Sequence, residues 1–486
     1  MIQIVAIDTP SLGDRGYLVT DGAAALVIDA QRDFDRILAV AQEHDVPVTH
    51  VLETHIHNDY VTGGYALARE TGAQYLVNGA DPVSFERTPV TGGDVLDVGA
   101  MRVRVLATPG HTFTHLSYVL QDGDQVLAVF TGGSLLAGST GRPDLLGDEH
   151  KVALARAQHA SARRLARELP ESTWICPTHG FGSFCSATAP AAAATGPAIT
   201  APAPAVPAPS PAPDPAAGPL LRGGGASTMA AELRVNPALT SGETEYVATT
   251  LAGLDDFPAY YAQMGPANLA GPPAPDLSPP PAAGPEELRR RIRAGEWVVD
   301  LRDRAEFAAG HLPGTLNFGL GPSLATYLGW LIPRGTPLTL LGRAPADIAA
   351  AQRELVRIGI DRPAAAAAGD PADWAAGAEL AQFATADFAE LARETRRRPL
   401  IVLDVRRRSE WEGWHIDGAL HIPLHELRSR MAQIPLGEIW VHCQAGYRAA
   451  VAVSMLAACG RKVVAIDDEL SRSRVAGLAG AGTARG

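Results

Sequence analysis

The sequence predicts a multidomain α/β protein, and three observations support this fold class. The 486 residues suffice for about three domains of roughly 150 residues each. Short apolar runs that are typical of strands alternate with amphipathic runs that are typical of helices. Finally, a segment that begins with a strand near residue 297 recurs about a hundred residues later, which indicates a duplicated parallel α/β unit.

Two Pro-rich stretches divide the chain. Residues 187–229 are rich in Ala and Pro and contain almost no large apolar side chains, so we expect a disordered insertion whose removal changes stability little. Residues 271–285 have the composition of an interdomain linker. The predicted domains are therefore 1–275, with the insertion inside it, then 283–380 and 385–478.

Composition excludes several classes of partner. A net charge of −12 argues against nucleic acid or anionic lipid as the main partner. No stretch approaches the roughly 20 apolar residues that span a bilayer, and the N-terminus lacks the pattern of a signal peptide. Four cysteines are too few for a disulfide framework in a chain of this length. We therefore expect a cytoplasmic protein with free thiols and no nucleic-acid or membrane partner.

A cysteine lies between a predicted strand and a predicted helix in the second copy of the repeat. The strand EIWVHC runs into the loop Cys443–Arg448, and the helix AAVAVSMLAAC follows. Unpaired N–H groups and the positive end of the helix dipole favour a thiolate at this position, and Gly446 permits a tight loop. The same N–H groups would stabilise a persulfide on Cys443. The alternative is a small buried cysteine at a strand end.

This pattern resembles the rhodanese family over residues 385–475, and four residues separate Cys443 from Arg448, as in sulfurtransferases. The resemblance implies that Cys443 is the nucleophile that carries sulfur and that Arg448 supports it. It also implies that the loop residues contact the substrate, namely Gln444, Ala445, Gly446 and Tyr447. The matching scaffold residues are Asp404, Arg406, Glu410, His415, Gly418, His421 and Pro423.

The first copy keeps the scaffold of the repeat but has no nucleophile. Its segment WVVDLRDRAEFAAGHLPGTLNF matches LIVLDVRRRSEWEGWHIDGALHIPL of the second copy and preserves Asp300, Arg302, Glu306 and His311. No cysteine occurs between Cys185 and Cys443. We therefore expect an inactive rhodanese-like domain that serves as a structural element or a docking surface.

Histidines follow three separate apolar runs in the N-terminal domain. The first run delivers His55, His57 and Asp59, and the later runs lead to His111 in TPGH and His179 in PTHG. A single histidine in such a place is usually a satisfied polar residue. Three strand ends that each deliver a histidine instead predict a metal site.

The order of these motifs resembles the metallo-β-lactamase superfamily over residues 1–186 and again from Arg234. Within it, the persulfide dioxygenase group is the most similar, on the stretches THIHNDYVTGG, TPGHT, FTGGSLL, GRPDLL and RVNPALT. The resemblance implies an αββα sandwich with a metal centre. Arg142, in the GRPD segment, is then a candidate contact for an anionic thiol, with a solvated arginine as the alternative.

Two departures from the family pattern change the expected metal site. Tyr60 stands where the family has a second adjacent histidine, and Gly133 stands where it has an aspartate that bridges two metals or completes an iron site. We therefore predict one metal ion, iron(II) in preference to zinc, held by His55, His57 and His111. Asp59 and His179 then support these ligands through hydrogen bonds or replace one of them.

The resemblances together predict a persulfide dioxygenase-like domain fused to a sulfurtransferase that acts on low-molecular-weight persulfides and thiosulfate, with a thiol acceptor, in sulfide oxidation or detoxification. One alternative is a mononuclear zinc thioester hydrolase of the glyoxalase II type. Another is a degenerate metal domain that serves as a scaffold for the active rhodanese domain. The sequence leaves the carrier thiol and the formation of a homodimer open.

Overall fold

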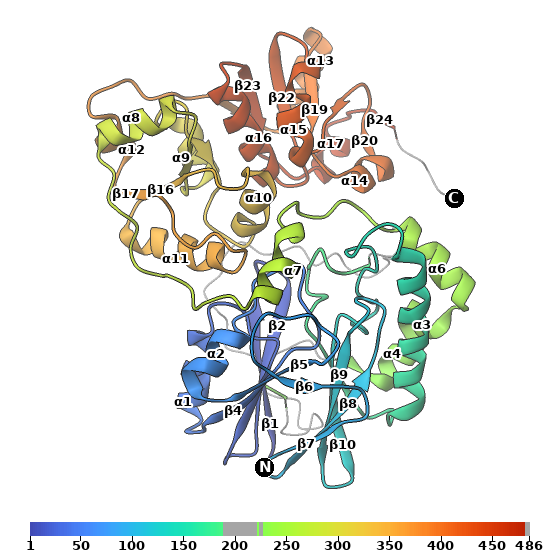
Figure 1. Cartoon of the computed structure of the whole chain (residues 1–486). Helices are drawn as coiled ribbons and strands as arrows, with labels where there is room; N and C mark the ends of the chain where they lie inside the picture. The colour runs from blue at the N-terminus through green and yellow to red at the C-terminus, as the bar shows by residue number, and fades with distance from the viewer. Residues whose placement is uncertain (188–220, 223–226, 482–486) are drawn as a thin grey trace. The chain divides into compact units, whose positions relative to one another are not determined.

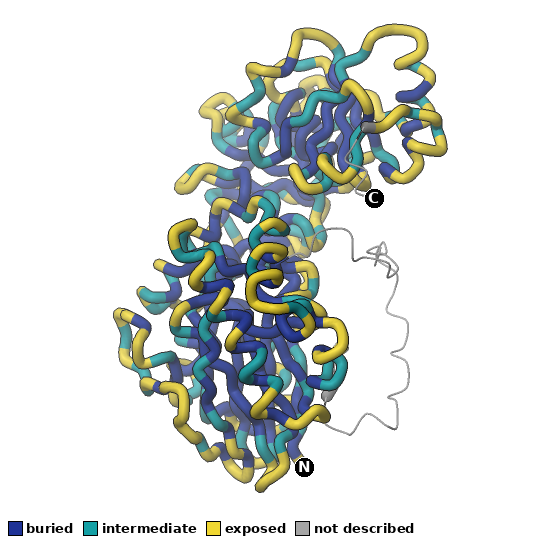
Figure 2. The backbone as a smooth tube through the Cα atoms, turned by 90° about the vertical axis from the view of Figure 1, so that its right-hand side faces the viewer, coloured by how far each residue is buried: buried dark blue, intermediate teal, exposed yellow. Residues whose placement is uncertain are grey.

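The computed structural model describes residues 1–187, 221–222 and 227–481, which belong to two compact units, Met1–Pro275 and Asp276–Gly486 (Figure 1). The mixed α/β architecture predicted from the sequence is confirmed. In each unit the buried residues form the interior and the exposed residues lie on the outside, as the dark blue and yellow segments in Figure 2 show. No helix in these ranges is long and apolar enough to cross a membrane.

The first unit contains two sheets. The order in the first sheet is β12 (Leu221–Arg222), β1 (Gln3–Thr9), β2 (Asp14–Thr20), β3 (Ala25–Ile28), β4 (Val48–Leu52), β5 (Gln74–Asn78) and β6 (Thr88–Val90). The order in the second is β13 (Ser227–Thr228), β11 (Trp174–Pro177), β10 (Gln125–Gly132), β9 (Leu116–Asp122), β8 (Met101–Ala107) and β7 (Val95–Val98).

Helices cover the outer faces of both sheets, which gives the expected αββα sandwich. The helices are α1 (Asp35–Glu43), α2 (Gly64–Thr71), α3 (Lys151–Glu168), α4 (Met229–Val235), α5 (Pro237–Thr240), α6 (Glu243–Ala252) and α7 (Tyr261–Ala270). Between the sheets lies a core with side chains from both, including Leu26, Val105 and Phe130. Ile37 of α1 and Leu67 of α2 pack outside the first sheet. Leu165 of α3 packs outside the second.

The second unit contains the duplicated fold. The first copy has the sheet order β15 (Leu316–Asn317), β14 (Trp297–Asp300), β16 (Leu338–Gly342) and β17 (Ala365–Ala368). Its helices are α8 (Pro285–Arg293), α9 (Arg304–Ala309), α10 (Leu324–Leu331), α11 (Pro345–Val356) and α12 (Pro371–Ala375). All strand pairs in this sheet are parallel.

The second copy repeats this order and adds one edge strand. Its sheet runs β21 (Leu420–His421), β19 (Ile401–Asp404), β22 (Glu438–His442), β23 (Lys462–Ile466) and β18 (Ala384–Ala386), and β20 (His415–Ile416) pairs separately with β24 (Gly480–Ala481). Its helices are α13 (Phe388–Arg397), α14 (Arg408–Gly413), α15 (Leu427–Arg430), α16 (Tyr447–Ala458) and α17 (Ser471–Val475), with short 3₁₀ turns η2 (Leu424–Glu426) and η3 (Met431–Gln433).

The predicted insertion, 187–229, extends too far at its C-terminal end. Residues 188–220 and 223–226 lie outside the described part of the chain, so the expected disorder concerns residues of which the structure says nothing. The C-terminal end of the segment, however, belongs to the fold: β13 pairs with β11, and Met229 is fully buried in the core under the second sheet. The Thr228 hydroxyl also caps α4 by accepting a hydrogen bond from the backbone N–H of Ala231.

Two deletions test this boundary. Removal of 187–229 should lower the free energy of unfolding by at least about 2 kcal/mol, because it removes the buried Met229 and the cap of α4. Removal of 190–218 alone should change it little, because the composition of that tract offers few side chains to a core. Thermal unfolding of the two variants beside the full chain measures the difference. Equal melting temperatures for both deletions would contradict the boundary.

Candidate functional site

The histidines of the first unit gather at the strand ends from which the sequence projects them. His55 and His57 follow β4, His111 follows β8, and His179 follows β11. All four side chains are at most 1% exposed. In this unit the groups whose ligand atoms lie within 4.8 Å of one another are His55–His111–His179, His57–Asp59–His179 and Asp29–Glu53–His57. The predicted combination of His55, His57 and His111 is not among them.

Each ring of the His55–His111–His179 group uses one nitrogen for a hydrogen bond. His111 Nδ1 donates to the carbonyl oxygen of Arg142 at 2.8 Å, and its Nε2 is buried without a hydrogen-bond partner. His55 Nδ1 lies 2.9 Å from the Thr54 hydroxyl. His179 Nδ1 donates to Asp14 at 2.8 Å and lies 3.2 Å from Asp59. Support of this kind on one nitrogen leaves the other as a metal ligand, so the three residues fit a mononuclear site.

Burial and neighbouring charges shift the pKa values of these three rings in different directions. Burial lowers the pKa of His55 well below its usual value, and burial lowers that of His111 to about 3, so both imidazoles are neutral as a metal requires. Burial alone would lower the pKa of His179 as well, but the carboxylates of Asp59 and Asp14 raise it well above the usual value. Its Nε2 lies 3.4 Å from His55 Nε2, so in this structure the protonated ring faces a neutral one.

His57 turns toward carboxylates instead of the other imidazoles. Its Nε2 lies 3.2 Å from Asp29, 3.3 Å from Glu53 and 3.0 Å from the hydroxyl of Tyr60, whose ring stacks on it. Although burial lowers its pKa, Asp29 and Glu53 raise it to about 9. The ligand atoms of His179 lie within 4.8 Å of those of His55 and His111, whereas Nε2 of His57 faces Asp29 and Glu53, so the geometry favours His179 over His57 as the third ligand.

The missing aspartate leaves no space behind. A Cβ on Gly133 would lie 2.3 Å from Cδ2 of His111, and a Cβ on Gly141 would lie 2.7 Å from its Nδ1. The ring of His111 therefore packs directly against two glycines. The backbone N–H of Gly133 donates to His115 Nε2 at 3.0 Å, which satisfies that buried histidine. A carboxylate at position 133 would require His111 to move.

Arg142 is fully engaged within the fold. Its guanidinium donates twice to Asp144 at 2.7 Å and also to the carbonyl oxygens of Phe184 and Asp255, and it lies over the ring of Phe257. This engagement speaks against the predicted contact with an anionic thiol. Arg142 instead contacts the candidate site through its backbone carbonyl oxygen, which accepts a hydrogen bond from Nδ1 of His111 and so orients that ring.

The residues that sequence reasoning missed are carboxylates and an amide that hold the histidine loops. Asp14, Asp29 and Glu53 are the carboxylates, and Asn268 of α7 donates to the carbonyl oxygens of His57 and Tyr60 while accepting from the N–H of Thr62. Asp29 and Glu53 were visible as acidic residues that end apolar strands. Asn268 carries no signal in the sequence because it is distant from the motif it holds.

The thiol loop of the second unit has the predicted geometry. Cys443 follows β22 and is 2% exposed, and Gly446 adopts a φ of 91° just before α16, which few other residues tolerate. The exposed Gln444 fixes the loop through its carbonyl oxygen, which accepts from the N–H of Leu470. Cys443 therefore lies between the end of β22 and the start of the twelve-residue helix α16, and a helix N-terminus offers unpaired N–H groups to an anion.

Arg448 is neutralised by a carboxylate of its own domain. Its guanidinium binds Glu410 in a bidentate pair, with one contact at 2.8 Å, and both side chains are largely buried. Burial raises the pKa of Glu410, but Arg448 outweighs it and lowers this pKa to about 2. Arg448 therefore holds the loop against α14, and its positive charge is already compensated.

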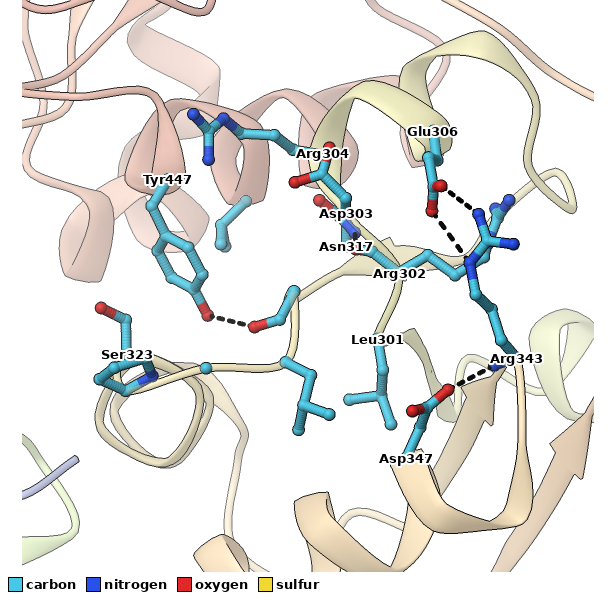
Figure 3. A pocket seen from close by; sticks show the side chains of 15 residues that line it. Leu301, Arg302, Asp303, Arg304, Glu306, Asn317, Ser323, Arg343, Asp347 and Tyr447 are labelled. Atoms are coloured by element: carbon cyan, nitrogen blue, oxygen red, sulfur yellow. Dashed lines mark hydrogen bonds and ion pairs between the residues drawn. The ribbon is translucent and has the colours of Figure 1, made fainter. Parts of the chain in front are cut away.

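The first copy places other residues at the equivalent positions. Asp300 pairs in register with Leu341, and Asp404 pairs with His442, so Gly342 occupies the place of Cys443. The next residue, Arg343, forms an ion pair with Glu306, as Arg448 does with Glu410 (Figure 3). The first copy thus also has a carboxylate–arginine pair beside this loop, but its arginine comes from a different loop position and a glycine stands in place of the thiol.

Comparisons with known proteins agree with this architecture. The model of the metallo-beta-lactamase superfamily matches residues 16–179, and the model of the rhodanese-like domain matches 284–375 and again 387–471. A solved metallo-beta-lactamase from Staphylococcus aureus subsp. aureus COL is similar with a TM-score of 0.60 and 24% identity, covering 75% of this chain and 98% of that one. That likeness shows a shared fold.

Relatives with curated descriptions match a smaller part of the chain. A hydroxyacylglutathione hydrolase from Cereibacter sphaeroides is 31% identical over 185 residues, which cover 36% of this chain and 67% of the relative. Another from Rhodopseudomonas palustris is 38% identical over 133 residues, 26% of this chain and 50% of the relative. The chain thus spans two thirds or less of these relatives. It belongs to the metallo-beta-lactamase superfamily through its first unit. Its second unit is a tandem of rhodanese-like domains.

Metal content tests the assignment of the ligands. His55→Ala, His111→Ala and His179→Ala should each lower metal affinity about 100-fold or more, since each removes an imidazole from a three-ligand site. His57→Gln should retain metal, because His57 faces Asp29 and Glu53. Elemental analysis after equilibrium dialysis against one metal measures occupancy, with circular dichroism as the control for folding. Retention in His179→Ala together with loss in His57→Gln would restore the combination predicted from the sequence.

Proposed function

We propose that the chain couples a sulfurtransferase to a metal-dependent thiol-processing domain, acting on low-molecular-weight persulfides and thiosulfate in sulfide oxidation or detoxification. The observation that carries the proposal is Cys443 at the start of α16, inside a loop closed by Gly446 and clamped by the Arg448–Glu410 pair. A thiol in this setting is suited to carry a sulfur atom, because the N–H groups of the loop can bind the terminal sulfur as an anion.

Sulfur transfer at Cys443 is a double displacement. The thiolate attacks the outer sulfur of thiosulfate, a new S–S bond forms, and the S–S bond of thiosulfate breaks with sulfite as the leaving group. The resulting persulfide on Cys443 is then attacked at its terminal sulfur by an acceptor thiolate, sulfite or cyanide. This second step returns the electron pair to Cys443 and regenerates the thiolate, so no external oxidant or reductant is required.

The first unit would contribute the oxidation of a persulfide. One equivalent each of persulfide, dioxygen and water yields one thiol and one sulfite, and sulfite is an acceptor for the sulfur on Cys443. His55, His111 and His179 would hold the metal, which when bound supplies open coordination positions for the thiol substrate and dioxygen. Asp14 and Asp59 would position His179, and Thr54 would position His55.

A thioester hydrolase is the second candidate for the first unit. Its support is the description of the curated relatives as hydroxyacylglutathione hydrolases, together with a donor set of three imidazoles, which also suits zinc. Against a two-metal form of this chemistry stand Gly133 and Tyr60, neither of which offers a carboxylate or an imidazole. A third possibility, a metal-free scaffold, is opposed by the unpartnered buried Nε2 of His111.

Metal analysis combined with two assays separates these candidates. We expect about one iron per chain and consumption of about one dioxygen per sulfite formed from glutathione persulfide, because three imidazoles leave coordination positions free for both reactants. His179→Ala serves as the matched inactive variant. One zinc per chain with hydrolysis of a hydroxyacylglutathione and no oxygen uptake would instead establish the hydrolase. Absence of any stoichiometric metal would leave only the scaffold.

Substitution of the thiol tests the sulfurtransferase. Cys443→Ser should lower thiosulfate:cyanide sulfurtransfer by about 10³-fold or more, because a hydroxyl cannot form the persulfide. Cys459→Ser, on the exposed end of α16, is the matched control and should retain the wild-type rate. Mass spectrometry after incubation with thiosulfate should find one added sulfur on wild-type protein and none on Cys443→Ser. An unchanged rate in Cys443→Ser would refute the assignment of the nucleophile.

A further inference from the structure

The inactive rhodanese-like copy reaches the thiol loop of the active copy through one arginine. Arg304 is the first residue of α9, and its Nε donates to Asp467 just after β23 at 2.7 Å. Other contacts fix the two copies against each other here: the N–H of Asn317 donates to the Ser454 hydroxyl, and the Tyr447 hydroxyl lies 3.4 Å from the carbonyl oxygen of Gly319. Figure 3 shows Arg304 and Tyr447 on the same side of the pocket.

The Arg304–Asp467 pair touches the loop at its tightest point. A Cβ on Gly446 would lie 2.5 Å from the carboxylate of Asp467 and 2.9 Å from Nε of Arg304. Two features therefore require a glycine at position 446. One is the close approach of the Arg304–Asp467 pair to the backbone of the loop, and the other is the φ of 91°. Arg304 also lies within electrostatic range of Cys443: burial lowers the pKa of this arginine, but Asp467, Asp303 and Cys443 together raise it.

The arginines around the loop differ in the nitrogens that their ion pairs use. Arg448 binds Glu410 in a bidentate pair through both terminal nitrogens, and Arg406 binds Asp404 in a bidentate pair through Nε and one terminal nitrogen. Arg304 binds Asp467 through Nε, and its side chain is 36% exposed. The two terminal nitrogens of the Arg304 guanidinium can therefore donate hydrogen bonds to an anionic oxygen while Nε remains bonded to Asp467.

We propose that the inactive copy completes the sulfurtransferase site of the active copy, with Arg304 as the cation that binds the oxyanion end of an anionic sulfur donor. This inference rests on the proposed sulfurtransferase activity of Cys443. It assigns the inactive copy a role in donor specificity: sulfonate-bearing donors such as thiosulfate are favoured in proportion to their charge. Asp467 holds the guanidinium beside Gly446, so that the donor sulfur faces Cys443.

Donor charge distinguishes this role from a structural one. In the full chain, Arg304→Gln should raise KM for thiosulfate, a dianion, about tenfold, and KM for benzenethiosulfonate, a monoanion, about threefold, because a cation contributes more to binding the higher charge. The kcat for sulfur transfer to cyanide should change less than twofold. Arg304→Lys should recover most of the loss for thiosulfate, because it restores the charge. Arg343→Gln, on the same copy but paired with Glu306, is the matched control and should leave both KM values unchanged.

The outcomes separate the two hypotheses. A selective rise in the KM for thiosulfate in Arg304→Gln, with recovery in Arg304→Lys, supports the inference. Equal rises for both donors, no rise at all, or the same rise in Arg343→Gln would overturn it. If Arg304→Gln lowers the melting temperature, Arg304→Lys alone decides: a KM for thiosulfate within threefold of wild type supports the inference, and a larger rise overturns it. Should Cys443→Ser keep the wild-type rate, the proposed function fails first, whatever Arg304 does.

Discussion

One buried carboxylate connects two of the loops that carry the candidate metal ligands. Asp29, at the end of β3, accepts hydrogen bonds from the backbone N–H and the hydroxyl of Thr54 and from the hydroxyl of Thr178, and it pairs with His57. It thereby joins the loops that carry His55 and His179. Burial raises the pKa of Asp29, but His57 and the hydrogen bonds outweigh burial and lower it, so the carboxylate stays ionised. Asp29 adopts a φ of 52°, a conformation that aspartate tolerates better than most residues.

This hub explains why two neighbouring histidines have different roles. Thr54 donates its only hydroxyl proton to Asp29, so it accepts from His55 Nδ1, and the second nitrogen of His55 becomes free for a metal. His57, two residues later, pairs directly with Asp29 through its Nε2. The same carboxylate thus supports one imidazole through Thr54 and binds the other itself. Two histidines that are neighbours in the sequence therefore acquire different surroundings from their partners.

These partner effects also define how far the sequence could be interpreted. The duplicated α/β unit and the Cys443 loop followed from the internal repeat and a six-residue motif, and the αββα sandwich followed from the resemblance of the histidine motifs to the metallo-β-lactamase superfamily. The pairing of His57 with carboxylates did not, because Asp29 follows a different strand, β3, and no sequence pattern shows that the ring turns toward Asp29 and Glu53. Arg142 was expected at a substrate, yet Asp144 and two distant carbonyl oxygens occupy its guanidinium. Met229 was assigned to the insertion because nothing near it in the sequence indicates that it is buried.

The two copies of the rhodanese fold share a buried ion pair, although only the second copy has the cysteine. The first copy keeps the Asp300–Arg302 pair, which corresponds to Asp404–Arg406 and ties each first strand to the loop after it. These buried pairs hold the scaffold, because breaking one would leave an uncompensated charge in the interior. The position of Cys443, by contrast, corresponds to Gly342, so the first copy forms its scaffold pair without a thiol. This scaffold is therefore independent of the nucleophile, and the start of α9 carries the Arg304 that binds Asp467 of the second copy.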